Sequence, residues 1–333
     1  MVVAEQVLRS GRRGAELRPF SRAAGVRHRS YSRRLQRVMT DFGAEHSFAR
    51  AAFHVREHYG IEVPINAVRG QTLQHARAIT GHESSQKPLL AQQVVTQMDG
   101  SMIPIVVPGP EGDRRKNKQV LWREARLCCT RDVKRVHPVY GATLGSVQTA
   151  AAVWADTARQ AGMHEQSQVH GVGDGAPWIL TQFGEQFGRQ GNYLVDFYHV
   201  SEYLAAAAPK VAAKGKHDQW RRRQQGRLLN NEVNKVLRSL EPHREPTATT
   251  DAPVEAAHRY ISERRAHLDY AKARGQGLPI GSGQIEGAHR HIVQQRLKLS
   301  GSWWKETTAQ AMLGLRVARA NNLWDDYWSN VKN

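Results

Sequence analysis

Three acidic residues next to glycines are the positions of this sequence best suited to chemistry. Asp99 ends an apolar run and precedes a glycine, and Asp174 follows another apolar run and lies between two glycines. Glu286 also precedes a glycine. Glycine lets the backbone approach a bound group closely, and carboxylates are ligands that hard cations prefer. One Asp-Gly pair alone is more typical of a turn, so the inference depends on finding three such acids.

The chemistry that suits such a set is phosphoryl transfer assisted by two metal ions. Two ions about 3.5–4 Å apart activate the attacking oxygen and stabilise the leaving oxygen of an in-line displacement. Clustered carboxylates repel one another strongly unless cations lie between them. We therefore expect Asp99, Asp174 and Glu286 to converge as catalytic residues that hold two Mg²⁺ or Mn²⁺ ions, although they are far apart in the sequence.

The composition indicates a polyanionic partner. The chain of 333 residues has 48 Lys and Arg against 30 Asp and Glu, a formal net charge of +18. Each phosphate that Lys or Arg neutralises releases a condensed counterion, so DNA is the expected partner. A membrane surface is the weaker candidate because no helix with a continuous apolar face stands out. The alternative is a basic protein without a polyanionic partner, in which the positive charge serves only solubility.

Cysteine content and hydropathy favour a cytoplasmic protein. The two cysteines, Cys128 and Cys129, are adjacent, which suits neither a disulfide framework nor a zinc site. No apolar run has the length of a membrane span, and no signal peptide is visible. We expect no membrane partner.

The first 85 residues divide into an arm and a helical module. Residues 1–40 contain ten Arg and only two acids, which predicts a flexible basic arm. Within 41–85, apolar residues recur at helical spacing on both sides of Gly60, which predicts a helix-turn-helix or, alternatively, an ordinary helical hairpin. The polar residues expected on the exposed side of the second helix are Asn66, Arg69, Gln71, Gln74 and His75. We expect Arg69 and Gln74 to face the major groove.

Residues 90–333 predict an α/β catalytic domain. A hairpin is expected from Val94–Met98 and Met102–Val107, with Asp99-Gly100 as its turn. Further strands are expected at 121–130, 168–172 and 193–195, and helices at 147–161 and 306–322. The charged helical stretch at about 205–275 is interpreted as an all-α insertion, and Ser282 as a cap for the helix that carries Glu286.

Several short strings in a fixed order resemble a known family. They are Met98-Asp99-Gly100-Ser101, Gly173-Asp174-Gly175-Ala176-Pro177-Trp178-Ile179, Asp196-Phe197-Tyr198-His199-Val200, and Leu278-Pro279-Ile280-Gly281-Ser282-Gly283-Gln284-Ile285-Glu286-Gly287-Ala288 with the following Arg296-Leu297-Lys298. From about residue 42 to residue 328, the chain resembles bacterial insertion-sequence DDE transposases of the ISKra group, distant relatives of Mutator-like transposases. Relatives often carry a cysteine-bearing, zinc-ribbon-like stretch upstream that nothing here matches, so a shortened copy is one alternative.

The resemblance implies an RNase H-like catalytic core, a mixed sheet flanked by helices, with an all-α insertion and a preceding helix-turn-helix module. It implies metal-dependent cleavage and strand transfer at the terminal inverted repeats of an insertion sequence, by a homo-oligomer on DNA. Asp196 and His199 are expected to support the metal-binding residues without contacting the metals, although Asp196 could simply cap a helix. Further DNA contacts are expected from His289, Arg290, Arg296 and Lys298.

Two rival functions come from different classes. One is a transposase-derived DNA-binding protein without catalysis, and the intact set of three acids argues against it. The other is an RNase H-like metal-dependent nuclease that hydrolyses DNA without joining it.

Trp178, Trp303 and Trp304 are expected to pack in the core rather than to stack on bases.

Overall fold

The computed structural model describes residues 5–12, 14–23, 31–80, 88–109, 117–246 and 251–331. The chain divides into two compact units. The terminal unit comprises Met1–Ser85, Val106–Lys118 and Gln295–Asn333, and the sheet unit comprises Gln86–Ile105 and Gln119–Gln294.

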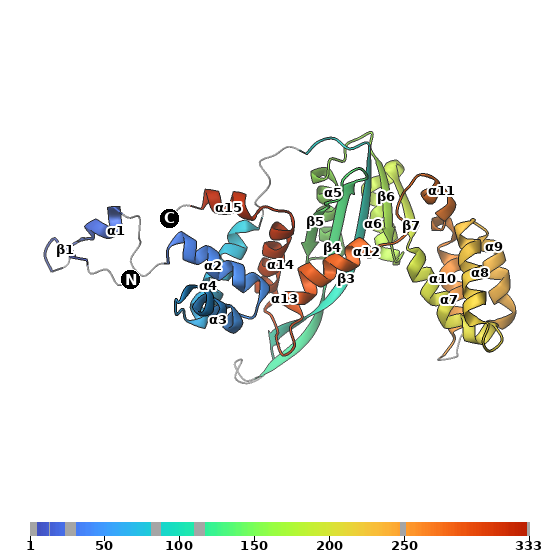
Figure 1. The fold of residues 1–333 in the computed structure, drawn as a ribbon, viewed down its shortest axis with the longest axis horizontal. Coiled ribbons are helices and arrows are strands. Elements are labelled where there is room, and N and C mark those ends of the chain that lie inside the picture. The colour runs from blue at the N-terminus through green and yellow to red at the C-terminus, as the bar shows by residue number, and fades with distance from the viewer. Residues whose placement is uncertain are drawn as a thin grey trace. The chain divides into compact units, whose positions relative to one another are not determined.

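A five-stranded mixed sheet with the strand order β5-β4-β3-β6-β7 organises the sheet unit (Figure 1). β3 is parallel to β6, and β6 is parallel to β7, whereas β4 and β5 pair in the antiparallel direction. The strands are β3 (Gln93–Pro108), β4 (Lys118–Asp132), β5 (Val139–Thr143), β6 (Gln168–Gly173) and β7 (Gly191–Val195). Helices α5 (Val147–Gln160) and α6 (Pro177–Phe187) pack against this sheet and each other around the buried Trp154. The predicted α/β class is confirmed.

The long hairpin in this unit differs from the one that the sequence predicts. β3 continues without a break through Asp99 and Gly100, so the expected turn between Val94–Met98 and Met102–Val107 is wrong. The Thr96 hydroxyl donates to the Cys129 carbonyl (3.2 Å), and the Gly109 N–H donates to the Asn117 carbonyl (2.9 Å). These pairs run in opposite sequence order, so β3 and β4 are the antiparallel arms of one longer hairpin.

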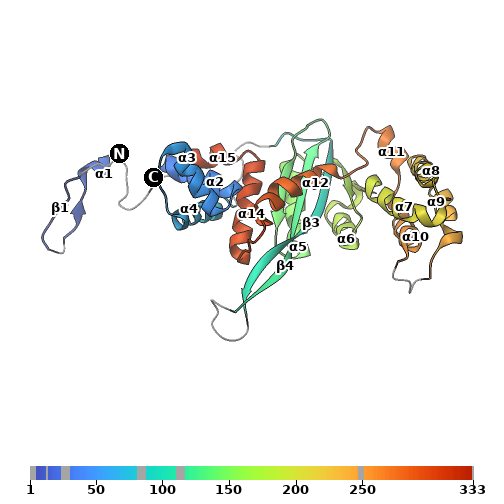
Figure 2. The ribbon, with the colours of Figure 1, turned by 60° about the horizontal axis from the view of Figure 1, so that its bottom comes forward.

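A helical layer follows the last strand. Its helices are α7 (Phe197–Val211), α8 (His217–Leu229), α9 (Val233–Leu240), α10 (Pro253–Glu263) and α11 (Tyr270–Gly275). Helices α7 and α10 pack together along their length, and α8 packs on α7, as Figures 1 and 2 both show. Leu204, Leu228, Leu240 and Ile261 are fully buried among them, which stabilises the layer by removing apolar surface from water. The chain is therefore helical throughout most of the predicted insertion at 205–275, and the helices begin earlier, at Phe197.

The terminal unit is built from helices at both ends of the chain. The elements are the short strands β1 (Leu8–Arg9) and β2 (Glu16–Leu17) and the helices α1 (Pro19–Ala23), α2 (Arg33–Glu45), α3 (Phe48–Tyr59), α4 (Ile65–Ile79), α13 (Gln295–Leu297), α14 (Glu306–Ala320) and α15 (Trp324–Asn330). Gly60 ends α3 with φ +65°, a left-handed conformation that glycine adopts without strain. The two helices expected around Gly60 are present, and α2 occupies part of the stretch predicted as a flexible arm.

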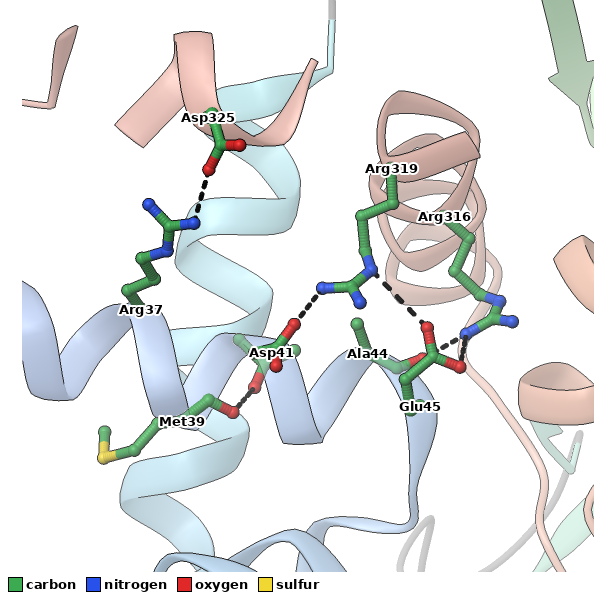
Figure 3. Close-up of polar contacts among 9 residues, drawn as sticks. Arg37, Met39, Asp41, Ala44, Glu45, Arg316, Arg319 and Asp325 are labelled. Carbon is green, nitrogen blue, oxygen red and sulfur yellow. Dashed lines mark hydrogen bonds and ion pairs between the residues drawn. The ribbon is translucent and has the colours of Figure 1, made fainter. Parts of the chain in front are cut away.

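Ion pairs connect α2 to the C-terminal helices (Figure 3). Arg319 pairs with Asp41, and Arg316 Nη1 lies 3.0 Å from Glu45 Oε2. The Arg316 side chain is only 5% exposed, so its pair is less screened by water than a surface pair. Helices α2 and α14, from opposite ends of the sequence, therefore belong to one folded unit.

None of the helices in the described ranges combines the length and apolar character needed to cross a membrane.

Candidate active site

The register of the three parallel strands brings three aspartates level with one another. Thr96 on β3 lies beside Gly171 on β6, and continuing this register by three positions sets Asp99 beside Asp174. Gly173 on β6 lies beside Val195 on β7, so the next position sets Asp174 beside Asp196. Ligand sites of open α/β sheets form at the carboxyl ends of parallel strands, which is where Asp174 and Asp196 lie.

A cavity of about 540 Å³ opens at this place in the sheet unit. All three acids predicted to bind metal line it, although they come from distant parts of the sequence. Five lining residues carry carboxylates, and no Lys or Arg is among the described ones. The lining residues are Met98, Asp99, Gly173, Asp174, Asp196, Tyr198, His199, Glu202, Pro279, Ile280, Gly281, Ser282, Gly283, Ile285 and Glu286.

Glu286 reaches the cavity because the segment before it is fastened to the sheet. It lies on α12 (Gly283–Ala288), and residues 278–282 lead into this short helix. His170 Nε2, on β6, is 2.9 Å from the Pro279 carbonyl, and the Phe197 N–H donates to the Ile280 carbonyl (2.9 Å). These two contacts set the place from which α12 starts.

Gln97 makes a third connection that the sequence alone did not reveal. Its amide accepts from the Ile285 N–H (2.9 Å) and donates to the Gly281 carbonyl (3.4 Å), and the residue is 3% exposed. It is two residues before Asp99 on the same strand, and alternate residues of a strand share a face. That spacing is the only feature of the sequence from which its role could have been inferred.

Asp196 is a buried anchor with both carboxylate oxygens engaged. It is 2% exposed, and Oδ1 accepts from the N–H groups of Tyr198 (2.6 Å) and His199 (3.2 Å) at the start of α7. Oδ2 accepts from both the N–H and the hydroxyl of Ser282. Ser282 occupies the N-cap position of α12, but its hydroxyl bonds Asp196 instead of a helix N–H, so the cap expected there is not formed. Asp196 thus links the start of α7 to the start of α12.

Glycines beside these acids are required by close packing. A Cβ on Gly281 would lie 2.7 Å from the ring of Tyr198, and one on Gly173 would lie 2.5 Å from the Tyr193 hydroxyl. Gly175 has φ +68°, which strains any other residue. A side chain at Gly173 or Gly281 would therefore require the neighbouring tyrosine or the glycine itself to shift.

The helical layer holds the segment that carries Asp174. The Tyr260 hydroxyl donates to the Asp174 carbonyl, and Arg264 Nε donates to the Gly175 carbonyl (2.9 Å). The Asp174 carboxylate itself accepts from the Ala176 N–H (2.9 Å). Tyr260 and Arg264 were not identified from the sequence, because their partners are backbone carbonyls 86 and 89 residues away.

Burial and neighbouring charged or titratable residues affect the pKa of Asp99. Burial raises the pKa of Asp99, the neighbouring His289 lowers it, and the charge of Asp174 raises it further. His289 Nε2 lies 3.5 Å from Asp99 Oδ2, and the His289 side chain is 3% exposed. The expected contact of His289 with DNA is therefore wrong, since the ring is buried against Asp99.

His199 and Glu202 lie on one face of α7 at the mouth of the same cavity. His199 Nδ1 is 3.4 Å from Glu202 Oε2, and the rings of Tyr203 and Tyr260 pack edge-on against the imidazole, with centroids 5.5 and 5.6 Å away. Glu202 is 77% exposed. It is the fifth carboxylate of the cavity, besides the three predicted ones and the buried Asp196, and it was not predicted.

The donor chemistry of the cavity fits a hard divalent cation. Asp99, Asp174 and Glu286 offer only oxygen atoms, and the repulsion between Asp99 and Asp174 is what a cation would relieve. In the described ranges, no three His, Cys, Asp or Glu side chains already stand as a set of metal ligands.

The predicted DNA contacts outside the cavity have different surroundings. Asn66, Arg69 and Gln74 are exposed on α4. Arg290, which precedes α13 in the sequence, and Lys298, which follows it, are also exposed. His75, expected to be exposed, is 3% exposed, with its ring nitrogens 2.9 Å from the Tyr327 hydroxyl and from Gln36 Oε1.

Arg296, another predicted phosphate contact, is buried as well. It is 2% exposed, and its Nε donates to the Gly43 carbonyl (3.0 Å). Trp304 is buried and Trp178 packs partly buried against the core, as expected, whereas Trp303 is 53% exposed.

Comparison with known proteins gives a family match. Residues 153–328, more than half of the chain, match the model of UPF0236, described as an uncharacterised protein family. A curated relative from Streptococcus gallolyticus, the "UPF0236 protein in vanSb 3'region", is 27% identical over 161 residues, covering 47% of this chain. The matched part spans 34% of the length of that relative.

Among solved structures, the chain is similar to the Drosophila P element transposase strand transfer complex. The identity is 9%, the TM-score is 0.35, and the match covers 93% of this chain and 84% of the other. At this TM-score, the likeness carries no weight for either fold or function.

Proposed function

This chain belongs to the UPF0236 family, and we propose that it is a DNA transposase that cleaves and joins DNA strands with the help of divalent metal ions. The observation that carries the proposal is the acidic cavity that Asp99, Asp174 and Glu286 all line. These are the same three residues that the resemblance to DDE transposases assigns to catalysis.

In the proposed site, these three residues hold two Mg²⁺ or Mn²⁺ ions. When bound, such ions activate an attacking oxygen and stabilise the leaving oxygen of a phosphodiester. Asp99 comes from the middle of β3, Asp174 from the end of β6 and Glu286 from α12, so sheet and helix together determine their spacing. Asp196 and Gln97 orient α12 through backbone contacts and do not contact the metals.

His199 has a supporting role in this proposal. Its ring is held between Glu202 and the aromatic rings of Tyr203 and Tyr260, at the mouth of the cavity. That position suits orientation of a carboxylate or of the DNA strand rather than metal binding.

The remaining parts of the proposal concern fold and DNA recognition. The mixed sheet flanked by helices supports an RNase H-like core. Helices α3 and α4, joined around Gly60, support a helix-turn-helix module in which exposed Arg69 and Gln74 face the major groove. The formal net charge of +18 supports affinity for DNA phosphate. A homo-oligomer acting on terminal inverted repeats completes the proposal.

The test is a strand-transfer assay with the terminal DNA of the element, a target plasmid, and Mg²⁺, Mn²⁺ or Ca²⁺. We expect joined products with Mg²⁺ and Mn²⁺ and none with Ca²⁺, whose coordination is larger and looser. Cleaved ends without joined products would identify a nuclease that only hydrolyses DNA. Neither cleavage nor joining, with DNA binding intact, would leave a DNA-binding protein and contradict the proposal.

The third acid is tested by a matched pair of variants. Glu286→Gln and Glu202→Gln remove the same charge from the same cavity. We expect Glu286→Gln to abolish strand cleavage and Glu202→Gln to retain it within about tenfold. The opposite result would assign the third metal-binding position to Glu202.

A further inference from the structure

A second cavity, of about 410 Å³, lies entirely within the terminal unit. Its walls come from the start of α3, from α4, from the outer ends of β3 and β4, and from the segment between α13 and α14. The described lining residues are Ser47, Phe48, Arg69, Leu73, Val106, Lys118, Arg296, Gly301, Ser302, Trp303, Trp304, Lys305 and Thr308. The volume is within the range of pockets that enclose small ligands.

The lining of this basic cavity is cationic. Arg69, Lys118, Arg296 and Lys305 contribute to it, and no Asp or Glu is among its described lining residues. Three of these cations are exposed at the cavity, while Arg296 is buried at its wall. A cavity with four such cations and no described carboxylate attracts anions.

Arg296 provides an independent indication of a ligand. Its guanidinium packs on the rings of Phe48 and Trp304, with Cζ 4.7 Å from each ring centroid. Nε donates a hydrogen bond to the Gly43 carbonyl. Nη2 is buried, and no hydrogen-bond partner for it exists among the described residues. The same holds for the indole Nε1 of Trp304.

Arg296 Nη2 and Trp304 Nε1 are two buried donors at one cavity that can each donate a hydrogen bond to a bound ligand. A buried polar group without a partner costs stability, and such groups in native structures usually bind a ligand, an ion or water. Trp304 is fixed in place because its carbonyl accepts from the Val106 N–H (2.7 Å). The two donors are therefore held at a fixed wall of the cavity.

Trp303 adds an aromatic surface beside these donors. It is 53% exposed although Trp is usually covered, and Lys118 Nζ lies 5.9 Å from its ring centroid. An exposed indole next to cations is the combination with which proteins bind unpaired nucleotides, by stacking on the base and pairing with the phosphate.

We propose that the basic cavity binds one nucleotide of an unpaired DNA strand, with its phosphate at Arg296 and Lys118 and its base stacked on Trp303. The choice of DNA rests on the proposed function, whereas the phosphate and the aromatic contact rest on the cavity itself. A strand end separated from its complement at a cleavage site is the substrate that this cavity would accept. Duplex DNA keeps its bases stacked and does not offer one to Trp303.

The test is fluorescence anisotropy of a labelled single-stranded oligothymidine with the full chain, in EDTA so that no cleavage occurs. We expect Trp303→Ala to weaken binding about tenfold, the effect of losing one base stack, and Lys118→Gln to weaken it about threefold. The matched controls are Trp122→Ala, which removes a Trp that is 57% exposed in the sheet unit, and Lys272→Gln on α11. Both controls should change the affinity less than twofold.

A second probe separates stacking from general attraction. A blunt duplex of the same length should lose little affinity on Trp303→Ala. If duplex and single strand weaken equally, the cavity is part of a general phosphate-binding surface and the proposal is wrong. If inorganic phosphate at millimolar concentration displaces the oligonucleotide and Trp303→Ala has no effect, the site binds phosphate alone, which also overturns the proposal.

Arg296→Lys tests the buried donor, because it keeps the charge and removes Nη2. We expect about a tenfold loss of single-strand affinity, and thermal melting shows whether the variant folds. Where it does not fold, the exposed Trp303 and Lys118 variants decide the question. Because this assay measures binding in EDTA, without any cleavage, failure of the proposed catalysis and failure of this inference are separate results.

Discussion

The acidic and the basic cavity have opposite charge and are built differently. The acidic cavity of the sheet unit has five carboxylates and no described Lys or Arg, whereas the basic cavity of the terminal unit has four Lys and Arg and no described Asp or Glu. In the first, strand register and α12 bring the acids together. In the second, helices α4 and α13, the start of β4 and the segment before α14 supply the cations. Although the chain has a formal net charge of +18, five carboxylates line one cavity, where a divalent cation could bind. Four Lys and Arg line the other, where a phosphate could bind.

The largest expected effect is at the acidic cavity. Asp99→Asn or Asp174→Asn removes one carboxylate from the metal-binding set, so strand cleavage should fall by about a thousandfold or more. The double variant should be no worse than either single variant, because the residues act as one unit. Binding to terminal DNA, measured by gel shift, should persist because Lys and Arg contacts provide most of the affinity. Cleavage near the normal rate in either variant would refute the acidic cavity as the active site.

The next effect separates supporting residues from metal-binding ones. His199→Ala should slow cleavage about 10–100-fold, the usual cost of losing a residue that orients metal ligands. Asp196→Ala should also lower the free energy of unfolding by about 1–3 kcal/mol, because donors from α7 and α12 lose their acceptor. Unaltered cleavage in both variants would reduce Asp196 to a helix cap. Loss of metal affinity in Asp196→Ala, with the fold intact, would make it a direct ligand.

At the terminal unit, the expected effect is on DNA recognition. Arg69→Ala should cost about 1–3 kcal/mol in binding to the terminal repeats if Arg69 contacts a base. Arg77→Ala, an exposed change on the same helix, is the matched control. Deleting residues 1–80 should abolish preference for the element's ends. If that preference survives the deletion, helices α3 and α4 have another function.

The smallest effect concerns the ion pairs of Figure 3. Glu45→Gln leaves the buried Arg316 without its charged partner and should lower the free energy of unfolding by about 1–3 kcal/mol. Arg37→Ala removes an exposed pair with Asp325 and should change it by less than about 1 kcal/mol. Urea denaturation measures both. Equal effects would mean that burial of Arg316 does not strengthen its pair.

The acids that line the candidate site were easier to identify from the sequence than the secondary structure in which they lie. Asp99 was expected in a turn because Asp-Gly is a turn pair locally, but pairing of β3 with β4 and β6 keeps it in a strand. Such pairing depends on residues far along the chain, so a local pattern does not reveal it. The strands and helices after residue 120 were predictable because their apolar spacing is regular.

Burial of charged and polar side chains was the part that local patterns missed. His289, His75 and Arg296 were expected at the surface because polar residues on helices usually face water. Each is buried by a tertiary contact: Asp99 for His289, Tyr327 and Gln36 for His75, and Gly43 for Arg296. Gln97 was missed for the same reason, since its partners Gly281, just before α12, and Ile285, on α12, are 184 and 188 residues away.

The most direct test of the central claim is the position of bound Mn²⁺. Anomalous diffraction from crystals soaked in Mn²⁺ locates each ion independently of any assumption about the site. We predict two ions in the acidic cavity, with oxygens of Asp99, Asp174 and Glu286 in coordination distance and both ions lost in Asp99→Asn. No ion in this cavity, or ions bound by other residues, would contradict the account.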